Sequence, residues 1–324
     1  MLFSNKKAPE PTRQTFVIAG ITVNVYSQPK ATKPGTPVAI MFLLHGRNGS
    51  ALKMGEFVTG IFDEVHAHRR KYDGEAQDLY IATFVGLAGS RNAGRGARAD
   101  YMNVQDQRNH GKRLVDKHAN QGWFDDPEQN NERHAIDMYA IQTGTAQDVS
   151  YLIDFLPSYL FPNGERQIAQ FLCVGKSLGG HATWIVLRNE CTEPRIKIGV
   201  PIIACPDYLA LMSRRAKSHK LPVGPPYFPQ ALLDLIHRAD PAAAPYNASD
   251  ESNPFLGKKI LVLSGQDDKK VPWASAKEFV EGLNVGPKGV KEVIVEPGVG
   301  HEFSPAMVKE CARFIWEHAL AHIA

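Results

Sequence analysis

The chain has 324 residues, of which 43% are hydrophobic, so it can bury a full core and lies at the upper end of the size range for one α/β domain. Charged residues make up 22% of the chain and the formal net charge is only +3, which excludes the strong basic field of a dedicated nucleic-acid binder. We therefore expect one large domain over residues 1–324 that carries insertions and binds no nucleic acid.

The first residues, MLFSNKKAPEPTRQ, include lysines and prolines but lack the apolar core of a secretory signal, and no later stretch is apolar enough to span a bilayer. We expect a cytoplasmic protein without a membrane span. The four cysteines have no C-x-x-C spacing, so we interpret them as reduced packing residues and predict no zinc site. They are Cys173, Cys191, Cys205 and Cys311.

Short apolar runs alternate with helical patterns along the chain, which predicts a mostly parallel sheet with helices on both faces. The opening run, residues 14–28, contains a central Ala-Gly pair and predicts a hairpin at the sheet edge. Six later runs predict buried strands because they are continuously apolar. They cover residues 38–46, 79–87, 167–175, 197–205, 259–265 and 292–298. A last apolar face at i, i+3 and i+4 spacing predicts a helix over 305–323.

Two stretches interrupt this alternation at the ends of predicted strands, where open α/β sheets bind their ligands. The first, residues 88–131, is rich in Gly, Arg, Asp and Asn, and its arginines could attract an anionic substrate or simply belong to a solvated loop. They are Arg91, Arg95 and Arg98. The second, residues 206–254, is rich in proline, and we interpret it as a cap inserted between two strands. Four aromatic residues either line an acyl pocket or hold the segment together. They are Tyr208, Tyr227 and Phe228 within the segment and Phe255 directly after it.

The segment FLCVGKSLGGHATW, residues 171–184, is the strongest local motif for chemistry. It places G-x-S-x-G between an apolar strand and a helical pattern, with Ser177 at the centre. Such a serine sits on a sharp turn where neighbouring side chains would collide, which explains the glycines. A phosphate-binding loop is excluded, because it requires a glycine where this chain has Gln170.

A serine hydroxyl is a poor nucleophile until a base takes its proton, so the motif predicts a later carboxylate and a histidine near the chain end. His301 follows the last apolar run in EPGVGHEF and precedes the final helix. The segment LSGQDDKKVP offers Asp268 as the acid, with its neighbour Asp267 as the main rival and Asp207 as a third candidate. One of these carboxylates would orient the histidine and stabilise its protonated form.

The segment FLLHGRNGS ends the predicted strand over 38–46 in a His-Gly turn. We expect this turn to direct the backbone N–H of Arg47 at the same oxyanion as the N–H of Leu178. His45, Gly46 and Lys176 are further candidates for substrate binding because they flank these groups in sequence.

Together these segments resemble the α/β-hydrolase superfamily from residue 38 to the final helix. The matching elements are the HG pair at 45–46, GKSLGG at 175–180, G-x-x-D-x-x-V-P at 265–272 and G-x-G-H at 298–301. The stretch DQRNHGKR, 106–113, is similar to a turn after the fourth sheet strand in such proteins. The resemblance implies about eight strands, a serine-esterase mechanism and no cofactor, and its motif register favours Asp268 over Asp267. Lys176 departs from the residues common beside the nucleophile, so the substrate class stays open.

The sequence thus predicts a serine hydrolase that cleaves a carboxylic ester or thioester of a small molecule through an acyl-enzyme intermediate. A peptidase or amidase of this fold would carry the same motifs, and so would a lyase that uses the same triad. A binding protein on an inactive scaffold should have lost a triad residue, and none is missing. The oligomeric state is left open.

Overall fold

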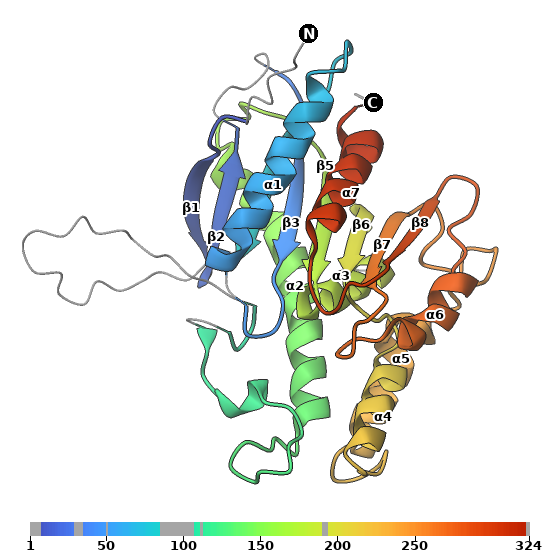
Figure 1. The fold of residues 1–324 in the computed structure, drawn as a ribbon. Helices are drawn as coiled ribbons and strands as arrows, with labels where there is room; N and C mark the ends of the chain where they lie inside the picture. Colours follow the sequence, from blue (N-terminus) through green and yellow to red (C-terminus); the bar gives the residue numbers. More distant parts are fainter. Residues whose placement is uncertain are drawn as a thin grey trace, which may run out of the picture.

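An eight-stranded sheet forms the centre of the protein (Figure 1). The structure is a computed structural model, and it describes residues 8–28, 35–49, 51–84, 107–110, 113–189 and 194–321. The strand order is β1-β2-β4-β3-β5-β6-β7-β8. The strands are β1 Thr12–Ile18, β2 Ile21–Ser27, β3 Val38–Leu44, β4 Asp78–Phe84, β5 Ile168–Lys176, β6 Ile196–Ile202, β7 Lys259–Gly265 and β8 Val290–Glu296.

The direction of the strands confirms the predicted mostly parallel sheet. Strands β1 and β2 form an antiparallel hairpin at one edge, and β2 pairs antiparallel with β4. From β4 to β8 every neighbouring pair is parallel, so the carboxyl ends of these strands meet at one edge of the sheet. Strand β3 is buried along its whole length, as a central strand covered on both faces should be.

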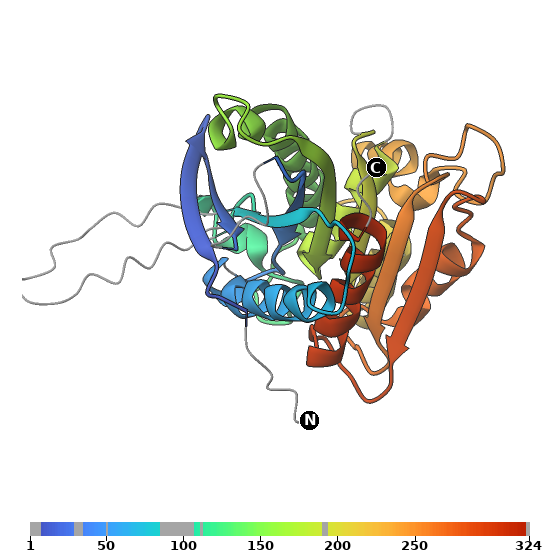
Figure 2. The same ribbon diagram turned by 90° about the horizontal axis from the view of Figure 1, so that it is seen from above.

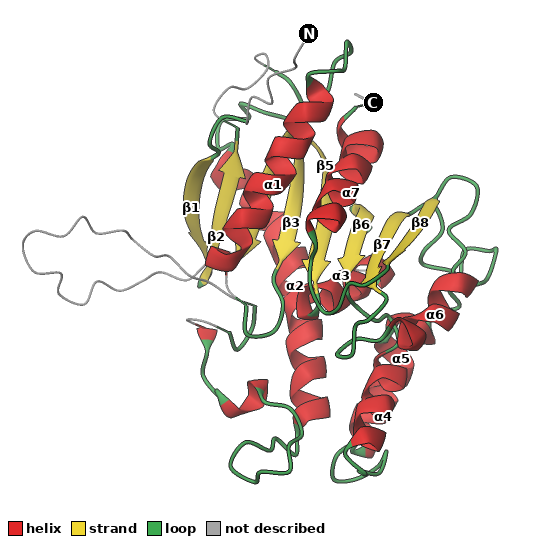
Figure 3. Ribbon diagram, viewed as in Figure 1, coloured by secondary structure: helices red, strands yellow, loops and turns green. Residues whose placement is uncertain are grey.

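Helices cover both faces of the sheet, as Figure 2 shows from above and Figure 3 by secondary structure. On one face α1 and α7 pack on the strands through a shared apolar core. On the other face the second half of α2, together with α3 and α6, encloses a second core. The α-helices are α1 Ala51–Arg69, α2 His134–Leu160, α3 Leu178–Arg188, α4 Tyr208–Ser218, α5 Gln230–Ala239, α6 Trp273–Gly282 and α7 Pro305–Ile315. The short 3-10 helices are η2 His118–Asn120 and η3 Pro241–Ala243, and η4 Trp316–Leu320 is a π-helix.

A third apolar cluster lies beyond the carboxyl ends of the strands and does not involve the sheet (Figure 1). It joins the first half of α2 to α4 and α5, which belong to the segment between β6 and β7. Met138 on α2 and Met212 on α4 are both buried in it. The proline-rich segment 206–254 therefore packs on α2 at the end of the sheet where the predicted site lies.

None of the described helices combines the length and the apolar character needed to cross a membrane. Three of the cysteines, Cys173, Cys205 and Cys311, are buried free thiols, which agrees with their prediction as packing residues. Cys191 lies outside the described residues.

Candidate active site

Ser177 occupies the sharp turn between β5 and α3. Its backbone has φ 53° and ψ −113°, a left-handed conformation that is strained for a residue with a side chain. The turn is held by two backbone hydrogen bonds, from the Ser177 N–H to the Ile202 carbonyl (2.8 Å) and from the Gly179 N–H to the His45 carbonyl (3.0 Å). These bonds tie the turn to both neighbouring strands and fix the direction of the serine side chain.

The glycines around Ser177 are required by close approaches of the backbone. A Cβ atom on Gly179 would lie 2.5 Å from the carbonyl oxygen of Leu44, at the end of β3. A Cβ atom on Gly175 would clash with the carbonyl of Gly179 itself. The crowding expected from the sequence motif is therefore present on both sides of the serine.

Ser177, His301 and Asp268 form one chain of hydrogen bonds. The Oγ atom of Ser177 lies 2.8 Å from Nε2 of His301, and Nδ1 of His301 lies 2.7 Å from Oδ2 of Asp268. The three residues follow β5, β8 and β7 respectively, so the parallel sheet brings their side chains to the same edge.

The surroundings of Asp268 keep its carboxylate ionised. Burial of the side chain opposes ionisation, but hydrogen bonds from His301 and from the backbone N–H groups of Val271 and Lys270 outweigh this effect and hold the pKa of Asp268 below its usual value. An ionised Asp268 accepts a hydrogen bond from the Nδ1–H of His301. The Nε2 atom of His301 is then unprotonated and can accept the proton of Ser177.

The two rival carboxylates have other positions. The Asp267 side chain is exposed, and its backbone N–H bonds to the carbonyl of Val299. Asp207 caps α4, where its Oδ1 accepts the N–H of Ala210 at 2.7 Å. Of the three candidates from the sequence, the hydrogen-bonded chain therefore contains Asp268.

The predicted oxyanion donors flank Ser177. Leu178 is the first residue of α3, where a backbone N–H has no partner within the helix. Arg47 follows the Gly46 turn, and a Cβ on Gly46 would lie only 3.3 Å from the Cβ of Ser177, so this turn passes directly against the serine. Within the described part of the chain, no backbone hydrogen bond is made by the N–H of Arg47 or Leu178.

His45 is buried and supports this turn from behind. Its Nε2 accepts the backbone N–H of Gln107 at 3.0 Å, and its Nδ1 donates to the Gly46 carbonyl at 2.8 Å. Burial, with a smaller effect of His110, lowers the pKa of His45 to about 3, so the ring is neutral. The described turn at 107–110 is thereby attached to the end of β3. His45 thus fixes the position of the turn and does not line the cavity described next.

A cavity of about 100 Å³ opens above Ser177. Its lining combines residues from the β3 turn, α2, the serine turn, α4 and the loop of the acid. They are Arg47, Asn48, Met138, Ser177, Leu178, His181, Arg215, Lys270 and His301. Burial lowers the pKa of His181 to about 4, so this lining histidine is neutral.

Several residues expected to contact a substrate lie elsewhere. Lys176 directs its Nζ over the ring of Phe57, 5.5 Å from the centroid, and does not line the cavity. The aromatic side chains of segment 206–254 hold this segment together, since Tyr208 and Phe228 are buried in the cluster of α2, α4 and α5. Phe255 is buried in the core beneath α3 and α6, and Tyr227 packs against the Tyr208 cluster. Arg91, Arg95 and Arg98 lie outside the described residues.

Arg215 is a cavity residue that the sequence analysis missed. It follows Leu211 and Met212 at helical spacing, so it lies on the buried stripe of α4, whereas Arg214 faces solvent. A charged residue within an apolar helical stripe is a signal available from the sequence alone. That this stripe faces Ser177, however, follows only from the packing of α4 on α2.

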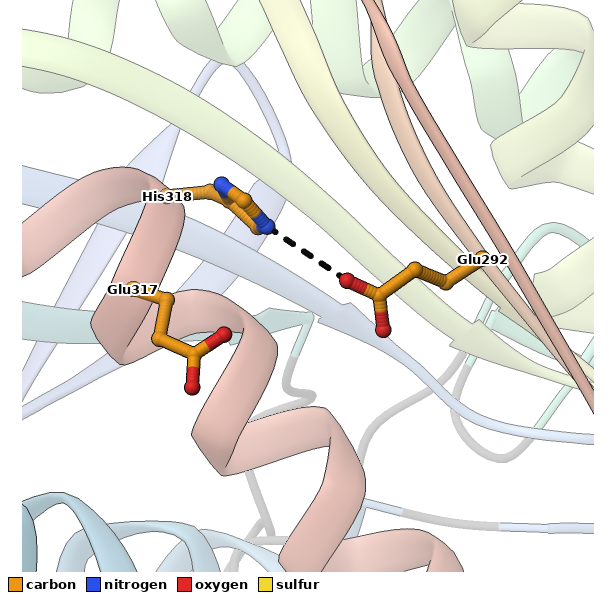
Figure 4. A group of neighbouring side chains, drawn as sticks. All are labelled: Glu292, Glu317 and His318. Carbon is orange, nitrogen blue, oxygen red and sulfur yellow. Dashed lines mark ion pairs between the residues drawn. The ribbon is translucent and has the colours of Figure 1, made fainter.

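One group of side chains elsewhere in the described chain has the composition of a metal site. Glu292, Glu317 and His318 place one possible ligand atom each within 4.8 Å of one another (Figure 4). Arg313 already forms ion pairs with both carboxylates, at 2.6 Å to Glu317, and His318 lies 3.6 Å from Glu292. Both carboxylates are therefore already engaged by the guanidinium of Arg313, and we assign the group no metal.

The chain is similar to solved structures across nearly its whole length. The structure of TT1662 from Thermus thermophilus has a TM-score of 0.59 and 19% identity, and the match covers 95% of this chain and 98% of that one. Est1E from Butyrivibrio proteoclasticus, solved with bound ferulic acid, gives a TM-score of 0.53 at 13% identity, with 94% and 98% covered.

The acylaminoacyl peptidase of Pyrococcus horikoshii gives a TM-score of 0.53 at 12% identity; the match covers 96% of this chain but 41% of the peptidase. No known protein-family model matches the sequence, and no curated protein is similar to it in sequence. Together with the sheet topology, the structural likeness shows that the chain has the α/β-hydrolase fold.

Proposed function

We propose that the protein is a serine hydrolase that cleaves carboxylic esters of small molecules. The observation that carries this proposal is the hydrogen-bonded chain from Ser177 through His301 to Asp268, with the serine on a strained turn at the carboxyl edge of the sheet. Strain is retained where it serves a function, and here it exposes the hydroxyl next to a base.

In this proposal, Ser177 Oγ attacks the acyl carbonyl while His301 Nε2 takes its proton, and Asp268 stabilises the resulting imidazolium. The negative charge on the former carbonyl oxygen is bound by the N–H groups of Leu178 and Arg47. His301 then donates the proton to the leaving alkoxide, and the acyl group stays on Ser177. Water, deprotonated by His301, attacks this ester and regenerates the serine. Every proton moves between groups of the chain, substrate and water, so the reaction requires no cofactor.

An ester is favoured over an amide because Est1E, solved with bound ferulic acid, and a ferulic acid esterase both match this chain over almost its whole length. The peptidase instead contains additional chain beyond the match. We further propose that residues 1–324 act as one domain whose segment 206–254 is a cap, because α4 of this segment contributes Arg215 to the cavity above Ser177.

The test is hydrolysis of p-nitrophenyl esters of increasing acyl length by the wild type and by Ser177→Ala. Ser158→Ala, which changes an exposed serine at the end of α2, is the matched control. We expect turnover by the wild type and the control and its loss in Ser177→Ala, with short acyl chains preferred because the cavity is small. Turnover of a matched anilide in preference to the ester would instead indicate an amidase. Unchanged turnover in Ser177→Ala would refute the assignment of the nucleophile.

A further inference from the structure

The cavity above Ser177 is lined by two arginines that form no ion pair with a described carboxylate. Arg47 and Arg215 both line it, together with Ser177 and His301, and Lys270 adds a third basic residue at its edge. The lining contains no aspartate or glutamate. Asp268 lies behind His301, and its oxygens are occupied by His301 and two backbone N–H groups.

Both guanidinium groups are positioned by neutral acceptors. Arg215 donates from Nη2 to the carbonyl of Lys270 at 2.9 Å, and its Nη1 lies 3.6 Å from the sulfur of Met212. Arg47 donates from Nη1 to the carbonyl of Asn120 at 3.5 Å. Neither arginine forms an ion pair with an acidic residue among those that the structure describes. Because a guanidinium has five N–H donors, each group retains donors for a ligand in the cavity.

Burial makes these charges costly for the protein. It lowers the pKa of both Arg47 and Arg215, and the charge of Arg47 lowers that of Arg215 further. An arginine stays protonated under such conditions, so two repelling cations share a partly buried site. An anion bound between them would relieve both the burial and the repulsion. A charge-assisted Arg–carboxylate contact is also among the stronger hydrogen bonds in proteins.

We propose that Arg47 and Arg215 select substrates whose short acyl group ends in a carboxylate. This inference rests on the proposed ester hydrolysis and adds the substrate class to it. The volume of about 100 Å³ fits a chain of a few carbons, so the carboxylate reaches the arginines while the scissile carbonyl lies at Ser177. The selection comes from the turn after β3 and from α4, two elements that the triad does not use.

The test compares the mono-p-nitrophenyl ester of glutaric acid with the p-nitrophenyl ester of pentanoic acid, which has the same chain length without the charge. We expect the wild type to show a higher kcat/KM for the glutarate ester. Arg215→Gln should reduce this preference by about 10-fold or more, the scale of a lost charge-assisted contact. Arg47→Gln should also reduce the preference, because it removes the guanidinium. It keeps the backbone N–H that the oxyanion requires.

Two variants separate charge from packing. Arg214→Gln removes an arginine from the exposed face of the same helix and should keep the preference of the wild type. Arg215→Lys keeps the positive charge and should keep most of the preference. A wild type that hydrolyses both esters without preferring the glutarate ester would overturn the inference and leave the ester hydrolase proposal intact. An equal loss in Arg214→Gln and Arg215→Gln would also overturn it.

A binding measurement decides the inference independently of catalysis. In the Ser177→Ala background, glutarate should raise the melting temperature, and the added Arg215→Gln substitution should abolish this shift. If the wild type hydrolyses no ester, the function proposal fails, while this binding result still supports or overturns the anion site. The absence of any glutarate effect in Ser177→Ala would count against the site.

Discussion

Asp268 and Asp267 are adjacent and chemically identical, yet the backbone gives them different positions. The N–H groups of Lys270 and Val271 both bind Oδ1 of Asp268, which directs Oδ2 toward His301. The neighbouring carboxylate is exposed to solvent. The order of residues in the sequence motif favours Asp268, but only the three-dimensional turn supplies the two donors that orient it.

Replacement of Asp268 by Asn should reduce kcat for a p-nitrophenyl ester by about 10³–10⁴-fold. The two backbone donors would hold the amide oxygen, so the amide NH₂ would face Nδ1 of His301. His301 would then carry its proton on Nε2 and could not accept the proton of Ser177. Steady-state kinetics with circular dichroism as a folding control would measure this effect.

Asp267→Asn is the matched control, since it makes the same chemical change one residue earlier on an exposed side chain. Its kcat should stay close to that of the wild type. If Asp267→Asn were the inactive variant and Asp268→Asn the active one, the assignment of the acid would be wrong.

Arg215 and Arg214 are likewise adjacent residues of the same type that the fold places differently, one at the cavity and one in solvent. The motif around Ser177 could be found in the sequence because its chemistry is local: a strand, a glycine turn and a helix follow one another. The positive charge in the cavity could not be found in the sequence, because it depends on which face of α4 packs against α2. This packing is a contact between residues far apart in the chain.

At the scale of elements, Asp240 links α5 to α4. It follows the last residue of α5, and its Oδ2 accepts the backbone N–H of Tyr208, the first residue of α4, at 3.0 Å. The side chain is buried, and burial, together with the charge of Asp207, outweighs the hydrogen bond from Tyr208 and raises the pKa of Asp240 to about 8. The carboxyl is therefore protonated at neutral pH.

This shift predicts a loss of stability as the pH rises. In the unfolded chain Asp240 ionises near pH 4, whereas the folded protein keeps the proton up to about pH 8, so the folded state binds more protons in this range. The free energy of unfolding should therefore fall between pH 4 and pH 8 because of this residue. Asp240→Asn keeps an acceptor for Tyr208 and should make the unfolding free energy less dependent on pH.

Denaturant unfolding at pH 5 and pH 8 measures this difference. Asp234→Asn, on the exposed face of α5, should leave the pH dependence of the wild type unchanged. An Asp240→Asn variant that loses as much stability as the wild type between these pH values would show that Asp240 is not protonated in the folded protein.

On the scale of the whole molecule, the parallel sheet explains how distant residues meet. Strands β5, β7 and β8 deliver Ser177, Asp268 and His301 to one edge, while β3 delivers the turn of Arg47. The strands themselves could be predicted because each is a short apolar run, although the run at 292–298 is shifted by two residues relative to β8, Val290–Glu296. The order of the strands could not be predicted from such runs, because the pairing of neighbours involves side chains and backbones that are remote in sequence.

For the segment 206–254, the sequence pattern indicates an insertion but not the roles of its side chains. Its position between two strands was evident from composition, and its aromatic residues allowed two interpretations. The structure places Tyr208 and Phe228 in the cluster of α2, α4 and α5, where their burial holds the segment on α2. The residue of this segment that lines the cavity is instead Arg215.

The central claim is that Ser177 is a nucleophile activated by His301, and covalent labelling tests it most directly. A fluorophosphonate should modify the wild type with loss of fluoride, and peptide mass spectrometry should place the phosphonate on Ser177. Ser177→Ala should remain unlabelled, and His301→Ala should react far more slowly because no base takes the serine proton. Labelling of another residue, or none in the folded wild type, would contradict the claim.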